Sequence, residues 1–151
     1  MSHQDVPIEI LLVEDNPGDA RLTQEALRGG HLRNTLHQVP DGVEALAFLR
    51  REGLYRAVPR PDLILLDLNL PRLDGRELLG ILKTHEDWRR IPVIILTTSD
   101  DEIDVLKAYD LHANCFITKP VELEAFLAVV HSMQEFWLAI VRLPANNHGA
   151  S

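Results

Sequence analysis

The sequence predicts a single α/β domain in which a doubly wound, five-stranded parallel sheet is covered by five helices on its two faces. The first observation is an alternation, because five short apolar runs of strand length are each followed by a segment of helical pattern. The second is that the runs 10–13, 63–66 and 93–96 are apolar without interruption, which is typical of parallel strands buried on both sides. The third is the length of 151 residues, which suits one domain with a substantial core.

The first unit begins with a strand at residues 8–13, which are rich in isoleucine, leucine and valine. Asn16 can cap the helix that follows, and Pro17 suits its first helical position. The glycine pair at 29–30 predicts the end of this helix.

The second and third units follow the same plan. A weaker strand is expected at residues 35–39, and Asp41 can cap the helix that continues through Arg50. The strongest strand of the chain is "DLILLDL", at residues 62–68. The third helix is expected from about residue 74 to 85.

The fourth and fifth units complete the alternation. Pro92 precedes the fourth strand, "VIILTT" at 93–98, and the fourth helix is expected at 100–111. The fifth strand is "NCFIT" at 114–118, and a long final helix begins near Glu122. Residues 1–7 are expected to be a flexible N-terminus.

Composition excludes several classes of protein. The net charge of −8 and the pI near 5.3 argue against a nucleic-acid partner, since phosphate contacts need clustered lysine and arginine. No apolar run approaches the roughly 18 residues of a membrane span, and the N-terminus lacks the pattern of a signal peptide. A single cysteine, Cys115, cannot form an internal disulfide. We therefore expect a cytoplasmic protein with no membrane contact.

The strand ends carry a concentrated set of polar residues. Ligands of an open parallel sheet bind outside the carboxyl ends of its strands, and there the chain delivers Glu14, Asp15, Asp67, Thr97 and Lys119. Three carboxylates in one crevice repel one another, and Mg²⁺ relieves the repulsion because it prefers carboxylate and carbonyl oxygens. The ammonium and the hydroxyl suit an incoming phosphoryl group. Asp67 lies centrally and can act as the nucleophile that forms an acyl phosphate.

Four motifs carry a family resemblance: "VEDN", "DLNLPRLDG", "LTT" and "FITKP". In type, order and spacing they resemble the receiver domain of two-component response regulators, a family similar to the chemotaxis single-domain regulators. The resemblance covers roughly residues 8–130. It implies the strand order 2-1-3-4-5, and a signalling protein, not an enzyme, that accepts a phosphoryl group from a sensor histidine kinase.

The resemblance also implies roles for individual residues, namely Asp67 as phosphoacceptor, Asp15 as direct Mg²⁺ ligand, Glu14 as ligand through water, Asn69 as ligand through its backbone carbonyl, Thr97 as switch hydroxyl, Phe116 as switch aromatic and Lys119 as phosphoryl contact. It further implies a cis bond between Lys119 and Pro120. Thr98 competes with Thr97, but the spacing of 30 positions from Asp67 favours Thr97. An aromatic in a strand is ordinarily a core residue, so Phe116 has that alternative role.

Two other classes share parts of this pattern. A haloacid-dehalogenase-type phosphatase also uses a strand-end aspartate, but it needs a second aspartate two residues on, where this chain has Asn69. A flavodoxin-like electron carrier must cradle a phosphate in its first loop, and Glu14 and Asp15 would repel that phosphate. Both alternatives are therefore less consistent with the sequence than a receiver domain spanning 8–133.

The C-terminal segment 134–151 is too short for an effector domain, so we expect the protein to act through protein contacts. The apolar residues of the last helix cover a wider arc than the stripe of little over about 100° that packing on one sheet requires. The segments "EGLYRAVPRPD" and "FWLAIVRLP" resemble small response regulators paired with phytochrome-type histidine kinases. We expect a homodimer on the fourth-helix, fifth-strand and fifth-helix face, extended by Phe136, Trp137, Ile140 and Val141. In the alternative, the tail folds back on its own domain.

Overall fold

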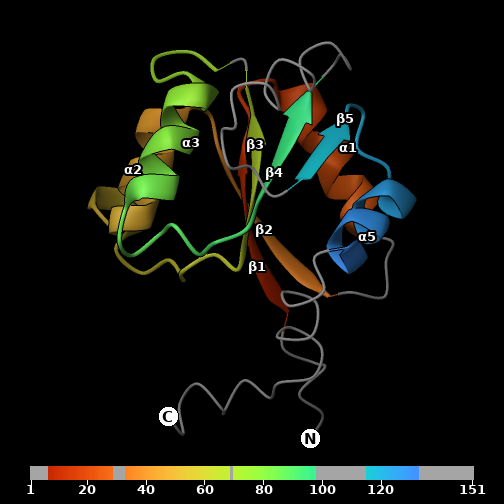
Figure 1. Ribbon diagram of the computed structural model, residues 1–151, viewed down its shortest axis with the longest axis horizontal. Helices are drawn as coiled ribbons and strands as arrows, with labels where there is room; N and C mark the ends of the chain where they lie inside the picture. Colours follow the sequence, from red (N-terminus) through yellow and green to blue (C-terminus); the bar gives the residue numbers. More distant parts are fainter. Residues whose placement is uncertain (1–6, 29–32, 69, 98–114, 133–151) are drawn as a thin grey trace, which may run out of the picture.

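The computed structural model describes residues 7–28, 33–68, 70–97 and 115–132. Within these residues five parallel strands form one sheet of order β2-β1-β3-β4-β5, as the family resemblance implies (Figure 1). The strands are β1 (Ile8–Val13), β2 (Asn34–Val39), β3 (Leu63–Asp67), β4 (Val93–Thr97) and β5 (Cys115–Thr118). The sheet order therefore places β1, β3 and β4 in the interior, and these are the three strands with uninterrupted apolar runs.

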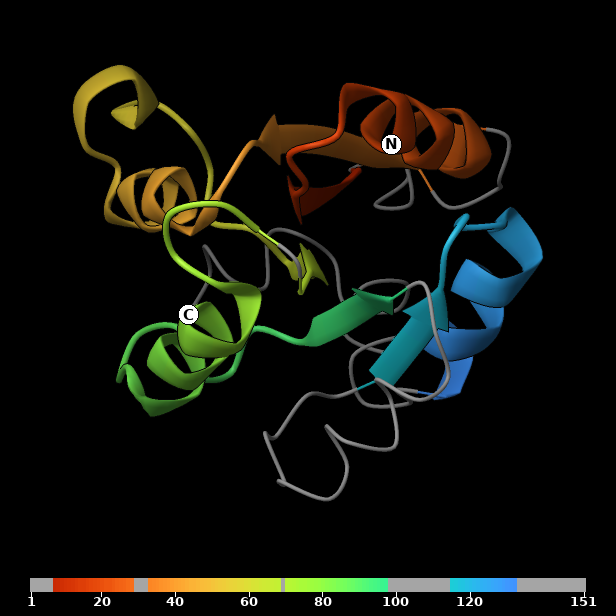
Figure 2. The same ribbon diagram turned by 90° about the horizontal axis from the view of Figure 1, so that it is seen from above.

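Four α-helices lie in the described part of the chain, together with the single 3₁₀ turn η2 (Gly53–Tyr55). They are α1 (Pro17–Arg28), α2 (Gly42–Arg50), α3 (Gly75–Thr84) and α5 (Leu123–Ser132). Helices α2 and α3 cover one face of the sheet, and α1 and α5 cover the other (Figures 1 and 2). The fourth helix expected at 100–111 lies outside the described residues. None of the helices in the described ranges is long and apolar enough to span a bilayer.

Side-chain caps set the starts of three helices. The Oδ1 atom of Asn16 accepts a hydrogen bond from the backbone N–H of Asp19 at 3.0 Å, and Pro17 is the first residue of α1. Asp41 caps α2 by accepting from the N–H of Glu44 at 2.8 Å. Asp74 accepts from the N–H of Arg76 at the start of α3. These caps satisfy amide groups that have no partner inside the helix.

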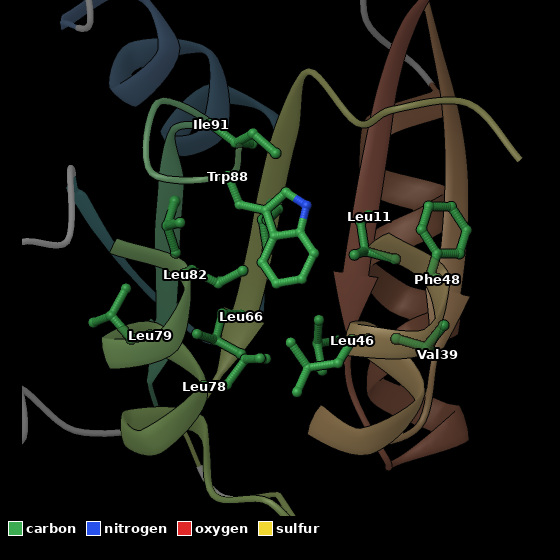
Figure 3. Packing of buried hydrophobic residues seen from close by; sticks show 14 of the residues in the cluster. Leu11, Val39, Leu46, Phe48, Leu66, Leu78, Leu79, Leu82, Trp88 and Ile91 are labelled. Carbon is green, nitrogen blue, oxygen red and sulfur yellow. The ribbon is translucent and has the colours of Figure 1, made fainter. Parts of the chain in front are cut away.

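Two separate cores hold the layers together. The core on the α2 and α3 side joins the sheet to both helices, and Figure 3 shows Leu46, Leu78 and Leu82 facing Leu11 and Leu66 of the strands. The core on the other side packs Ala20 and Leu27 of α1 and Phe126 and Val130 of α5 against the alternate residues of the same strands. Each buried leucine, valine or phenylalanine side chain contributes about 1.5–3 kcal/mol to folding. Burial on both faces leaves the ends of the strands as the place for polar chemistry.

Candidate functional site

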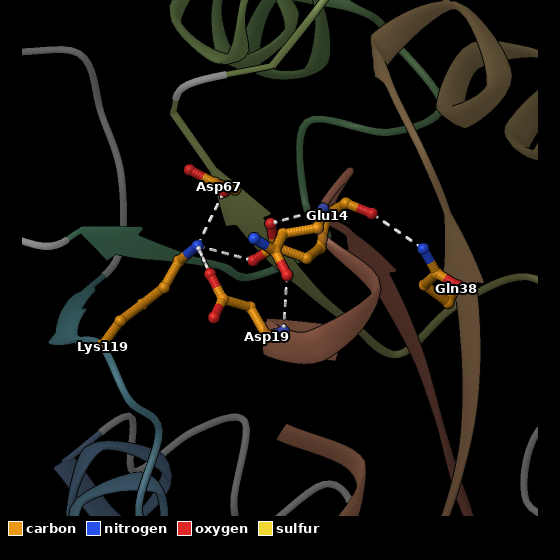
Figure 4. Close-up of polar contacts among 6 residues, drawn as sticks. Glu14, Asp19, Gln38, Asp67 and Lys119 are labelled. Carbon is orange, nitrogen blue, oxygen red and sulfur yellow. Dashed lines mark hydrogen bonds and ion pairs between the residues drawn. The ribbon is translucent and has the colours of Figure 1, made fainter. Parts of the chain in front are cut away.

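Parallel pairing brings the predicted polar residues to one edge of the sheet. β1 leads directly into Glu14, β3 ends at Asp67, β4 ends at Thr97, and Lys119 follows β5. All five strands point the same way, so these positions gather at the carboxyl edge, which is the top in Figure 1. Figure 4 shows the side chains of Glu14, Asp67 and Lys119 converging there, although they are far apart in the sequence.

Three carboxylates form a group with the spacing of a metal site. Glu14, Asp15 and Asp67 each offer an oxygen, and these oxygens all lie within 4.8 Å of one another. Glu14 and Asp67 are buried, whereas Asp15 is exposed. Hard divalent cations such as Mg²⁺ take carboxylate oxygens and retain several waters, so a partly open cluster of this kind fits them.

The ammonium group of Lys119 ties this edge together. Its Nζ atom lies 2.6 Å from Oε1 of Glu14 and 2.8 Å from Oδ2 of Asp67. A third carboxylate, that of Asp19 in α1, lies at 3.1 Å (Figure 4). The backbone N–H of Lys119 donates to the carbonyl of Thr97 at 2.7 Å. The Lys119–Pro120 bond is cis, as the resemblance implies.

Burial and mutual contact shift the ionisation of the two most enclosed groups. Desolvation raises the pKa of Glu14, and a hydrogen bond with Asp67 adds to this against the opposing effect of Lys119, so the pKa rises to about 7. Burial of the Lys119 ammonium disfavours its charge, but hydrogen bonds to Asp67, Glu14 and Asp19 outweigh that cost. The pKa of Lys119 therefore lies above its ordinary value, and the ammonium stays charged.

The raised pKa of Glu14 predicts an unusual pH dependence of stability without metal. Between the ordinary pKa of 4.5 and the folded value of about 7, the folded protein holds a proton that the unfolded chain has released. The free energy of unfolding therefore falls as pH rises through this window, by on the order of 3 kcal/mol from this group. Urea unfolding at pH 5 to 8 with a chelator present measures the slope. Glu14→Gln should flatten it, and equal slopes in both proteins would contradict the assignment.

Two contacts that sequence reasoning missed hold Glu14 in place. The side-chain amide of Gln38 donates to the backbone carbonyl of Glu14 at 2.8 Å, and the N–H of Asn16 donates to Oε2 of Glu14 at 3.2 Å. Gln38 belongs to β2, which pairs with β1 in register, so it lies beside the end of β1. A polar residue near the end of a weak edge strand carries no sequence signal for this contact.

The other predicted residues fall into two groups. Thr97 is buried at the end of β4, and Phe116 is half-buried and packs against the core on the α2 and α3 side. Asn69, Thr98 and the tail residues Phe136, Trp137, Ile140 and Val141 lie outside the described residues. The switch roles of Thr97 and Phe116 and the ligand role of Asn69 therefore stay predictions.

Salt bridges hold the loop that follows β3. Arg72 has a positive φ of 62° and donates to both carboxylate oxygens of Asp41, at 2.9 and 3.1 Å. It also reaches Glu44, whose other oxygen accepts from the hydroxyl of Tyr55 at 2.6 Å. Burial opposes the charge of Asp41, but the bonds from Arg72 and from the N–H of Glu44 outweigh it and lower the pKa of Asp41. These contacts tie the loop after β3 to the start of α2.

Residues 10–131 match the model of the protein family "Response regulator receiver domain". The chain belongs to this family. Among curated proteins, Response regulator Rcp1 of Synechocystis sp. is 49% identical over 139 residues, which cover 92% of this chain and 95% of Rcp1. The receiver-domain prediction and its fold are thereby confirmed.

Solved structures of relatives share the fold over nearly the whole chain. The bacteriophytochrome response regulator RtBRR is 42% identical with a TM-score of 0.81, covering 92% of this chain and 84% of that one. The phosphorylated cyanobacterial phytochrome response regulator RcpA is 48% identical with a TM-score of 0.72, covering 93% and 100%. The Mn(2+)-bound form of Rcp1 is 49% identical with a TM-score of 0.71, covering 92% and 100%. These relatives are signalling proteins.

Proposed function

We propose that this receiver domain accepts a phosphoryl group on Asp67 from a phytochrome-type sensor histidine kinase and signals through protein contacts. One observation carries the assignment. A carboxylate oxygen of Asp67 lies 2.8 Å from the Lys119 ammonium and within 4.8 Å of the oxygens of Glu14 and Asp15. Nucleophile, counter-charge and metal ligands thus meet at one point, which is the arrangement that phosphoryl transfer requires.

The transfer is a displacement at phosphorus. A carboxylate oxygen of Asp67 forms the new P–O bond, and the P–N bond of a phosphohistidine breaks, leaving the imidazole with the bonding pair. The product is an acyl phosphate on Asp67. The Lys119 ammonium holds Asp67 in position and can donate to the oxygens of the arriving group, because its charge is secured by three carboxylates. Little other chemistry is required of the protein.

We infer that Mg²⁺ is the cation that the cluster takes. The donor set is made of carboxylate oxygens, and Asp15 is exposed, which leaves room for retained waters. Asp15 and Asp67 would hold the ion directly and Glu14 through water, with the carbonyl of Asn69 as a further ligand. When bound, the ion neutralises charge that develops on the phosphoryl oxygens. The existence of a Mn(2+)-bound form of Rcp1 supports the proposal that a divalent cation binds here.

The kinase class follows from the relatives. RtBRR and RcpA are described as phytochrome response regulators, and both are aligned over more than nine-tenths of this chain at over 40% identity.

Phosphotransfer profiling against the sensor kinases of the source organism tests this part of the proposal. We expect transfer to be fastest from a kinase with a bilin-binding sensor, in Mg²⁺ and not in chelator. Faster transfer from a kinase without such a sensor would contradict the phytochrome assignment.

We also propose a homodimer formed through the C-terminal segment, with Phe136, Trp137, Ile140 and Val141 at the interface. The support is the apolar pattern of this segment, since large apolar side chains left in water each forfeit about 1.5–3 kcal/mol. A two-fold interface uses the same patch on both copies.

Replacing Trp137 and Ile140 together by polar residues should convert the dimer into a folded monomer, and light scattering measures the change in mass. A wild type that is monomeric at tens of micromolar, with and without phosphorylation, would show that the tail folds back.

A further inference from the structure

Asp19 is a carboxylate that the proposed phosphoryl transfer does not use, yet it reaches the centre of the site. It lies in the first turn of α1, and its Oδ2 atom is 3.1 Å from Nζ of Lys119 (Figure 4). An ammonium group has three N–H donors, and here they meet three carboxylates, those of Glu14, Asp67 and Asp19. The donors of Lys119 are thus fully engaged before any phosphoryl group arrives.

The position of Asp19 is set by its own helix. Its backbone N–H donates to Oδ1 of the capping residue Asn16 at 3.0 Å. A carboxylate in the first turn also gains from the positive end of the helix dipole. The backbone of Asp19 is therefore held at this place independently of Lys119.

Exposure distinguishes Asp19 from the other two acceptors. The side chain of Glu14 is 1% exposed and that of Asp67 is 7% exposed, whereas that of Asp19 is 39% exposed. When the ammonium leaves a carboxylate, water must replace it, and water reaches only Asp19 readily. The distance from Nζ of Lys119 to Asp19 is also the longest of the three. Asp19 is the partner that Lys119 can release at the smallest cost.

We propose that Asp19 is a positioning residue for Lys119, holding the third N–H of the ammonium in the unphosphorylated protein and competing for it with the phosphoryl group. The inference rests on the proposed function, because the competition exists only if an anion is placed on Asp67. The phosphoryl oxygens need a donor, and Lys119 provides one by turning away from Asp19. Asp19 also adds a fourth carboxylate near the cluster of Glu14, Asp15 and Asp67, which favours the cation and disfavours the anion.

The Asp19→Asn variant separates these effects because it keeps the shape and removes the charge. Two titrations are informative: Mg²⁺ alone by calorimetry, and trifluoroberyllate, a phosphoryl mimic, at saturating Mg²⁺ by fluorine NMR. We expect the Kd for Mg²⁺ to rise by roughly three- to tenfold, the effect of one charge at several ångströms in a partly screened site. We expect the Kd for trifluoroberyllate to fall by a similar factor. A merely structural role would not shift the two constants in opposite directions.

Glu25→Gln is the matched control. It removes one negative charge from an exposed position on the same helix, where Glu25 pairs only with Arg21 among the contacts described. Both dissociation constants should stay at the wild-type values in this variant. Asp19→Glu retains the charge and should return the Mg²⁺ constant toward wild type, which ties the effect to the charge.

The outcomes distinguish the two proposals. If wild type binds Mg²⁺ and trifluoroberyllate but Asp19→Asn shows unchanged constants, or both shifted the same way, the role of Asp19 is wrong and the proposed function stands. If wild type binds neither ligand, the proposed function itself fails, and the role of Asp19 fails with it.

Discussion

The Asp67→Asn protein should gain no mass when it is incubated with Mg²⁺ and a small phosphodonor, whereas wild type should gain one phosphoryl group. The reason is chemical: an amide oxygen is too weak a nucleophile to attack phosphorus, and the replacement removes one of three carboxylates of the cation site. Intact-mass spectrometry measures the result directly. We expect a loss of at least about 100-fold in the rate of labelling, since the nucleophile itself is removed.

The substitution should leave the fold intact, so the loss can be assigned to chemistry. Asparagine has nearly the shape of aspartate, and Lys119 keeps its contacts with Glu14 and Asp19. Asp87→Asn is the matched control, because Asp87 is an exposed aspartate outside the carboxylate cluster. That protein should be labelled like wild type. Equal labelling of Asp67→Asn in Mg²⁺ would show that another residue is the acceptor.

The Gly75→Ala protein should lose about 2 to 4 kcal/mol of its free energy of unfolding. Gly75 is the first residue of α3 and lies against the end of β3. A Cβ atom placed there would come within 2.4 Å of the carbonyl oxygen of Asp67 and 2.7 Å of Cα of Leu68. Both obstacles are backbone atoms of the segment that carries the phosphoacceptor, so relief requires the site itself to move. Urea unfolding measures the loss, and labelling of Asp67 should slow with it.

Gly80→Ala provides the comparison within the same helix. Gly80 is exposed in the middle of α3, and an added Cβ meets no atom within 4 Å. Alanine has the higher helix propensity, so this variant should be more stable than wild type by up to about 1 kcal/mol. A Gly75→Ala protein as stable as wild type would mean that the approach of α3 to β3 is looser than the structure shows.

The sequence by itself determined the strands, the caps of the first two helices and the edge at which the chemistry lies. Uninterrupted apolar runs identify β1, β3 and β4, because a parallel strand that is buried on both faces has apolar residues at every position. Glu14, Asp67 and Lys119 were predicted to meet because parallel strands bring their carboxyl ends to one edge. The order of the strands came from the family motifs, since an apolar pattern does not encode which strands are neighbours.

Only the tertiary structure decided which groups touch and how they ionise. Asp19 comes from a helix that the sequence places on no particular face, and its contact with Lys119 spans 100 positions of the chain. Gln38 reaches Glu14 because β2 pairs with β1 in one register, which a weak edge strand does not specify. The pKa of Glu14 depends on desolvation by residues packed around it from several elements. Such contacts depend on how distant segments pack against one another, and local sequence patterns do not specify that packing.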